Sequence, residues 1–171
     1  MSPVVRLLPE DVPLRRGVQI SWRVPMAQTP PLRKLAWYYF AEDGWTYVGN
    51  EVDRTARVVS ASVRGFGGFA VVPDTVAPEL NLIRPNEGDP NLRPGSAIVI
   101  RFADSLSGIQ DEDHFRLEID GRKAIAEWDP EEEILRYVPD PPLAPGRHRL
   151  RVWVEDRCGN RSERSLEFFV K

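Results

Sequence analysis

The chain has one cysteine, Cys158, and two histidines, His114 and His148, in 171 residues. A lone cysteine cannot form an internal disulfide, so no covalent framework of that kind exists and the redox compartment stays open. The two histidines share no spacing typical of a zinc site. There is no Gly-x-Ser-x-Gly motif, and residues 65–68, Gly-Phe-Gly-Gly, lack the following helix of a phosphate-binding loop. These absences predict a protein that is not an enzyme and needs no cofactor.

Long apolar runs and strongly basic regions are missing as well. No stretch approaches the roughly 18 apolar residues of a membrane-spanning helix, so we expect no membrane insertion. Residues 1–9 lack the basic segment and apolar core of a signal peptide. Either the protein is cytoplasmic or its export signal lies outside this sequence. The net charge of −3 argues against nucleic-acid binding, which needs a clustered basic surface.

What the chain has in abundance is proline, with 16 residues. Prolines separate many short elements, and the hydrophobic and charged fractions of 42% and 29% are those of a globular protein. Residues 72–78, Val-Pro-Asp-Thr-Val-Ala-Pro, interrupt two β-like regions and predict a short, stiff linker. We expect an all-β fold of two tandem antiparallel β-sandwich modules, at residues 1–75 and 76–171.

The first half shows alternating and aromatic segments. Apolar and polar residues alternate over 18–24, as in a half-buried strand. The runs 35–40 and 45–48 flank a turn at 42–44 and predict a hairpin. Residues 57–63 and 66–72 predict a second hairpin around Gly65.

The second half predicts about seven strands. They are expected at 80–83, 97–103, 115–119, 123–128, 134–138 and 147–154, with a last strand that points Leu166, Phe168 and Val170 inward. Turn signals roughly every eight to twelve residues are typical of a β-sandwich. The residues assigned to turns are Asp120, Gly121, Gly146, Asp156, Gly159 and Asn160.

An ordered set of short motifs lies in this half. The motifs are Asp104-Ser105-Leu106-Ser107-Gly108-Ile109, Asp120-Gly121, Tyr137-Val138-Pro139, Leu143-Ala144-Pro145-Gly146-Arg147-His148 and Glu155-Asp156-Arg157-Cys158-Gly159-Asn160. Together they resemble the bacterial immunoglobulin-like repeats of secreted and cell-surface proteins, over about residues 76–171, with a fibronectin type III-like sandwich. Cys158 stands where such repeats more often have a small residue such as alanine. The first half resembles more loosely the β-module that precedes such repeats, through residues 45–49 and Asp74.

The resemblance implies a location and neighbours. It implies a non-catalytic structural, spacer or interaction tandem of a larger exported or surface protein. The location would be extracellular, periplasmic or on the cell surface. The partners would be neighbouring domains of the same protein, because similar modules accompany cell-wall peptidases, glycoside-active enzymes or adhesins.

An alternative function rests on the aromatic hairpin. Trp37, Tyr38, Trp45 and Tyr47 cannot all lie on one face of it, so some rings would point outward and could stack on a polysaccharide. The chain would then be a carbohydrate-binding module accessory to a cell-wall or polysaccharide-active enzyme. The competing interpretation is that Trp37, Tyr39 and Trp45 fill a small core while Tyr38 covers its edge.

Two further surfaces have a possible binding role. Asp104, Asp111 and Asp113 belong to an acidic loop whose oxygens suit Ca²⁺, although the spacing matches no EF-hand and a solvated acidic surface is the competing interpretation. Residues 147–153 alternate arginines with apolar residues and place Trp153 beside them. That face predicts either a partner interface or the solvent side of an antiparallel strand.

Overall fold

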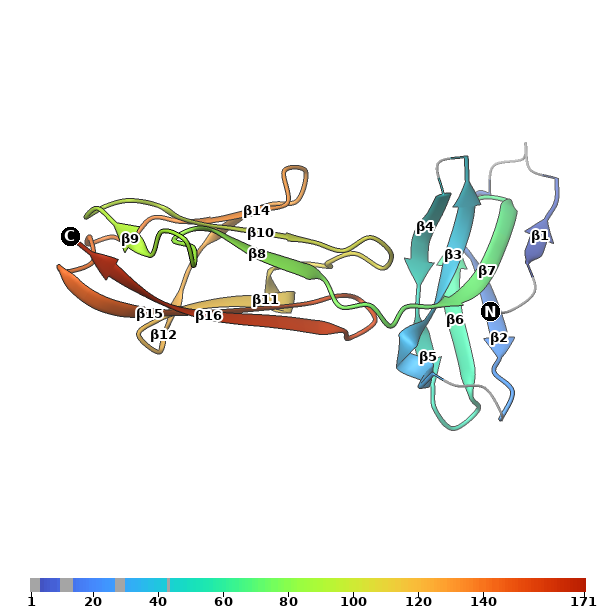
Figure 1. Ribbon diagram of the computed structural model, residues 1–171. Helices are drawn as coiled ribbons and strands as arrows, with labels where there is room; N and C mark the ends of the chain where they lie inside the picture. The colour runs from blue at the N-terminus through green and yellow to red at the C-terminus, as the bar shows by residue number, and fades with distance from the viewer. Residues whose placement is uncertain (1–3, 10–13, 27–29, 43) are drawn as a thin grey trace. The chain divides into compact units, whose positions relative to one another are not determined.

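The computed structural model describes residues 4–9, 14–26, 30–42 and 44–171, and Figure 1 shows its ribbon. The protein is all-β, and its sheets are antiparallel apart from one short parallel pairing. Within the described ranges, the helical segments are two 3₁₀ turns, η1 (Leu32–Lys34) and η2 (Glu112–His114). In the same part of the chain, no helix is long and apolar enough to cross a membrane.

The chain forms two compact units. The first contains Met1–Val76 together with two later segments, Ser105–Gly108 and Arg157–Asn160. The second contains Ala77–Asp104, Ile109–Asp156 and Arg161–Lys171. The break after Val76 lies inside the expected linker. The first unit differs from the expected module in that it also contains the two later segments. The sequence could not predict this, because a linear pattern does not indicate which distant strand a loop packs against.

The first unit has two sheets. Its strands are β1 (Val5–Leu7), β2 (Val18–Arg23), β3 (Leu35–Ala41), β4 (Gly44–Gly49), β5 (Glu51–Asp53), β6 (Val58–Val63) and β7 (Gly67–Pro73). One sheet has the order β1-β7-β3-β4 and the other the order β2-β6-β5. The core between them is made by alternate residues of the strands, which point to the same face. It includes Leu35, Trp37, Val59, Val63 and Val71.

One expected hairpin forms and the other does not. In the β3–β4 hairpin, Phe40 lies opposite Trp45; Asp43 of the expected turn is outside the described residues. The expected hairpin of 57–63 with 66–72 is wrong. β6 pairs with β2 and β5, whereas β7 pairs with β1 and β3. The chain therefore crosses between sheets near Gly65, because turn residues show where a chain reverses but not which sheet takes the next strand.

Strand β3 is buried on both faces. Its first four residues, Leu35 to Tyr38, are at most 2% exposed. Leu35 and Trp37 face the core, while Ala36 and Tyr38 belong to a second cluster with Ala70, Val72 and Cys158. Leu106 packs against the same cluster. The two later segments of the first unit thus supply the side chains that cover the other face of this sheet.

The second unit is a sandwich of two sheets. Its strands are β8 (Glu79–Arg84), β9 (Asn91–Leu92), β10 (Ile98–Ala103), β11 (Phe115–Ile119), β12 (Arg122–Ala124), β13 (Glu127–Asp129), β14 (Ile134–Tyr137), β15 (Gly146–Glu155) and β16 (Arg161–Val170). The sheets have the orders β13-β14-β10-β8 and β12-β11-β15-β16-β9. Their shared core includes Ile98, Ile100, Leu135, Leu150 and Phe168, none of which is measurably exposed.

Two details of this unit differ from the expected strands. The single strand expected at 123–128 is divided into β12 and β13, which belong to different sheets. The short β9 is additional and runs parallel to β16, where Asn91 lies opposite Phe169. Both are places where the chain passes from one sheet to the other, and a short strand there has too few residues to show a period.

Candidate functional site

The aromatic residues expected to bind a ligand are mostly packed inside the first unit. Trp37 is 2% exposed and donates a hydrogen bond from its indole Nε1 to the Val59 carbonyl oxygen at 2.9 Å. Tyr38 is completely buried. Trp45 and Tyr47 are half-buried and pack against the cluster that contains Tyr38. Trp37 and Tyr38 therefore cannot present their rings to a sugar, and Phe40, at 58% exposed, is the outward aromatic of this hairpin.

The second cluster of the first unit has polar side chains along its edge. The Tyr47 hydroxyl donates to Asn50 Oδ1 at 2.8 Å, and the Arg157 guanidinium lies over the Tyr47 ring, 5.0 Å from its centre. Asn50 donates in turn to the Arg157 carbonyl oxygen at 3.0 Å. Burial raises the pKa of Tyr38 far above its ordinary value, and Cys158 and Asp74 add to the effect. Tyr38 is therefore a neutral core residue.

Asp74 is the most deeply buried charged residue of the first unit, with no exposed surface. Its carboxylate accepts hydrogen bonds from the backbone N–H groups of Ser107 and Val76, both at 3.2 Å. Asn160 donates from Nδ2 to the Asp74 carbonyl and carboxylate oxygens, and its own Oδ1 accepts from Lys34 Nζ at 2.6 Å. Asp74 thus joins the chain after β7 to both later segments of the unit.

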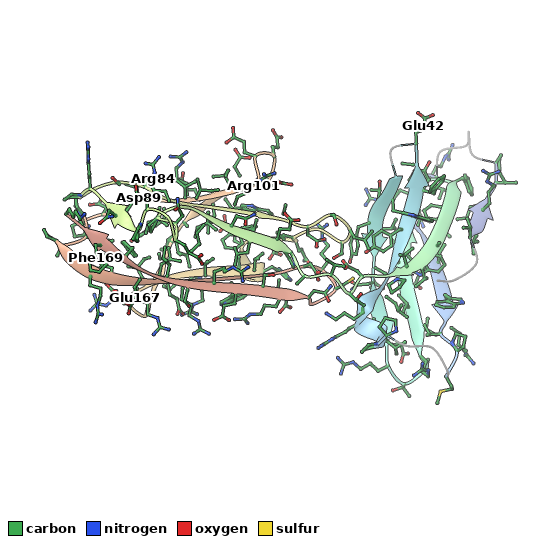
Figure 2. All side chains as sticks on the ribbon, in the orientation of Figure 1. Glu42, Arg84, Asp89, Arg101, Glu167 and Phe169 are labelled. Atoms are coloured by element: carbon green, nitrogen blue, oxygen red, sulfur yellow. The ribbon has the colours of Figure 1, made fainter. Side chains whose placement is uncertain are left out.

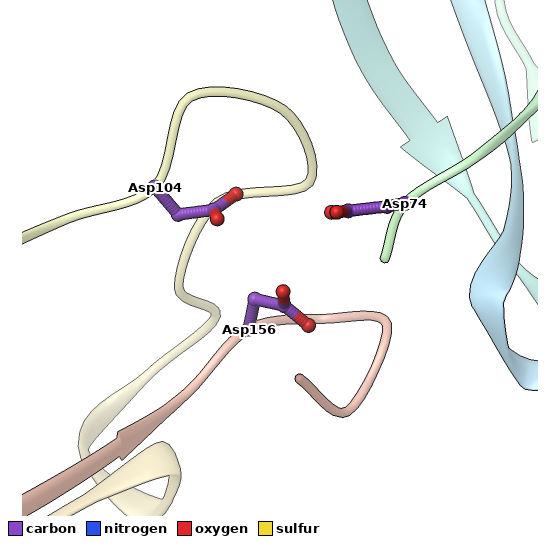
Figure 3. A group of neighbouring side chains, drawn as sticks. All are labelled: Asp74, Asp104 and Asp156. Atoms are coloured by element: carbon purple, nitrogen blue, oxygen red, sulfur yellow. The ribbon is translucent and has the colours of Figure 1, made fainter. Parts of the chain in front are cut away.

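The three acidic residues expected to bind calcium do not converge. Asp111 caps η2 by accepting from the Asp113 backbone N–H at 3.1 Å, and its Oδ1 lies 2.6 Å from His114 Nδ1. The hydrogen bond with His114 lowers the pKa of Asp111. Asp104 instead lies near Asp156 in the second unit, with carboxylate oxygens within 4.8 Å (Figure 3).

The expected turn residues lie at strand ends of the two units. Asp120 and Gly121 join β11 to β12 with φ of 53° and 77°, the pair of positive values that a tight two-residue hairpin turn requires. Gly146 and Gly159 also have positive φ, at 139° and 71°. Asp156 and Asn160 are 1% and 7% exposed, so their side chains are directed inward.

Asp120 also holds a histidine. Its Oδ2 lies 2.7 Å from His148 Nδ1, and the Ala144 carbonyl oxygen lies 2.8 Å from His148 Nε2. Two acceptors suit the protonated ring, which donates from both nitrogens. The hydrogen bond with Asp120, followed by that with Ala144, raises the pKa of His148. Partial desolvation acts against ionisation of Asp120, but the Arg149 N–H and His148 hold its pKa below the ordinary value.

The arginine-rich face of β15 is matched by carboxylates. Arg151 Nε lies 2.6 Å from Glu163 and Arg147 lies 3.7 Å from Glu167. Arg161 covers the Trp153 ring at 4.2 Å. Arg151 lowers the pKa of Glu163 through their hydrogen bond.

The outer side of the other sheet is similar. Figure 2 labels Arg101 on β10, which lies 2.6 Å from Glu133, with both side chains exposed. Such exposed ion pairs contribute little energy each and keep the surface solvated.

An open groove in the first unit was not foreseen from the sequence. Its volume is about 490 Å³ and it lies where β6 ends and the chain crosses to β7. The residues that form it include Tyr39, Val48, Val63, Arg64, Phe66 and Phe69. Only the run Arg64-Gly65-Phe66-Gly67 could have pointed to it, as a basic and an aromatic residue held among glycines.

No protein-family model matches this chain, and no curated protein is similar to it in sequence.

Proposed function

We propose that this chain is a non-catalytic structural tandem of a larger exported or surface protein, where it positions a neighbouring catalytic or adhesive domain. The observation that supports the proposal is that the side chains best suited to binding or catalysis are already bonded within the fold. Asp74, Asp120, His148 and Asn160 each bind backbone groups or one another at turns and loop crossings. Cys158 is 1% exposed and packs in a cluster. A side chain whose hydrogen bonds are already used in this way supports the fold.

The strand order of the second unit supports an immunoglobulin-like assignment. With β8, β10, β13 and β14 as strands A, B, D and E, one sheet has the order D-E-B-A. With β11, β15 and β16 as C, F and G, the other contains C-F-G. These orders match those of the two sheets of an immunoglobulin sandwich, with β12 as an additional strand beside C. Because this fold serves many functions, the assignment supports neighbouring domains as partners of the chain and does not identify a ligand.

The proposal is tested by finding the native polypeptide in its source cells. Antibodies raised against the purified chain are used on blots of intact cells, of cells treated with protease from outside, and of the culture medium. We expect a band well above the 19.5 kDa of this chain, lost after external protease or present in the medium. A 19.5-kDa band that survives the protease in intact cells, and disappears only after lysis, would contradict both the larger protein and its exported location.

A further inference from the structure

The groove of the first unit has a rigid aromatic wall. The Tyr39 ring packs 5.4 Å from the Phe69 ring at an angle of 54°. It also lies directly on Gly67, where a Cβ atom would be 2.5 Å from Tyr39 Cε2. Gly67 has a φ of 138°, which side-chain-bearing residues rarely adopt. The glycine therefore leaves the space in which the Tyr39 ring lies.

The floor and rim of the groove differ in character. Val63 and Phe69 are 3% and 4% exposed and close its base. Phe66 is half-buried on the wall, and Arg64 is exposed at the rim. The groove thus offers an apolar base, aromatic faces and one cation.

The cation of this groove is available to a ligand. Arg64 has no hydrogen bond or ion pair with any residue that the structure describes. Among the residues that the structure describes, none of those lining the groove is acidic. A guanidinium matches a carboxylate with two parallel hydrogen bonds, so the charge of the groove is complementary to an anionic ligand.

We propose that this groove binds a saccharide that contains uronic acid. The C–H faces of the sugar rings would lie on Tyr39 and Phe66, and a ring carboxylate would pair with Arg64. The volume falls in the range of roughly 300 to 1,000 Å³ that small-ligand sites have, and such sites combine apolar walls with a few polar groups. The proposal is independent of the structural role proposed above. The residues that contact the saccharide would be those of the groove rather than Trp37 and Tyr38.

The test is calorimetric titration of the full chain at pH 7. The probes are tetramers of α-linked galacturonic acid and of β-linked mannuronic acid, each compared with its methyl ester, which has the same rings without charge. We expect one of the acids to bind and its ester to bind at least tenfold more weakly, since charge-assisted hydrogen bonds carry the difference. Raising the salt concentration is expected to weaken binding of the acid and to leave binding of the ester unchanged, because Arg64 is exposed.

Variants test whether the probe binds in the groove. Arg64→Gln is expected to weaken binding of the acid about tenfold and to remove its salt dependence. Phe66→Ala is expected to weaken binding of the acid and of the ester alike, by about fivefold. Arg54→Gln is the matched control, because Arg54 is an exposed arginine of the same unit in the turn before β6, at the far end of that strand. It should bind as the original chain does. Thermal unfolding of each variant establishes that it is folded.

Several outcomes would overturn the proposal. One is no binding of either acid, and another is equal binding of acid and ester. Equal losses in Arg64→Gln and Arg54→Gln would show that overall charge attracts the probe. Equal binding of tetraglutamate would show that the groove recognises carboxylates without a sugar ring.

Discussion

At the scale of single residues, charged side chains of this protein hold several of its turns. The clearest case is the Asp120–His148 pair, in which a hairpin-turn carboxylate binds the imidazole ring and the Arg149 N–H together. The pKa of His148 is raised, so its stabilising effect is complete below 6.5 and is lost as the pH rises through the folded pKa. The pKa of Asp120 is lowered, so its effect is present above 3.8 and lost in stronger acid. The pair is therefore strongest between these two values.

Asp120→Asn tests this pH window. Asparagine also tolerates positive φ, so the turn is kept while the charge is removed. We expect the free energy of unfolding to fall by about 1 kcal/mol at pH 5.5 and by clearly less at pH 9; the value is below that of a buried charged hydrogen bond because the Asp120 side chain is 46% exposed. Denaturant unfolding at both pH values measures it. Asp129→Asn, at a turn without a histidine, serves as the control, and an equal loss at both pH values for Asp120→Asn would refute the role of His148.

Asn160 is a second residue with a measurable structural role. Asn160→Ala removes the acceptor of Lys34 and a donor to buried Asp74. Because a buried polar group without its partner is costly, we expect the free energy of unfolding to fall by about 2 kcal/mol. Ser165→Ala, on the exposed side of β16, should change it by less than about 0.5 kcal/mol. Equal effects of the two substitutions would show that the bonds of Asn160 add nothing.

At the scale of elements, the crossing from β6 to β7 depends on one glycine. Gly67→Ala places a Cβ against the Tyr39 ring at an unfavourable φ, and we expect a loss of about 3 kcal/mol or more. Gly65→Ala is the matched control, since nothing lies within 4 Å of its Cβ position and its φ is not positive. It should change stability by less than about 1 kcal/mol. Melting temperatures of the two variants compare them, and similar values would mean that Tyr39 simply moves aside.

The strands themselves were largely predictable, and their partners were not. Alternation located β2, β10, β15 and β16 because each is long enough to show a period of two. The β6–β7 crossing and the division of β12 from β13 depend on which sheet offers an open edge, and local sequence does not record this. The same limit applies to the sites. Asp120 and Gly121 were assigned from turn chemistry alone, whereas Tyr39, Arg64 and Phe66 meet only through packing across two sheets.

At the scale of the whole molecule, the first unit is not a continuous stretch of chain. Leu106 and Cys158 cover Ala36, Tyr38 and Ala70, and Asn160 binds Asp74. A fragment of residues 1–76 would leave that face of the β1-β7-β3-β4 sheet uncovered. The second unit, by contrast, has all its strands within 77–171.

Fragments test this difference. We expect 1–76 to bind a hydrophobic dye and to unfold without a sharp transition, because it lacks the side chains that bury Tyr38. Residues 77–171 should unfold cooperatively, since the sandwich core is complete in that fragment. Calorimetry and dye fluorescence give the comparison. A sharp transition of 1–76 at the temperature found in the full chain would show that the later segments are dispensable for the first unit.

The discontinuity also sets an order of events during synthesis. A ribosome releases Val76 long before Asn160, and at roughly 5 to 20 residues per second the interval lasts several seconds. Through that interval the strands made first lack Leu106 and Cys158, so Tyr38 and Ala70 are not yet covered. The first unit is therefore completed only when Asn160 has been made, long after its strands, and this interval is when the nascent chain would most need a chaperone.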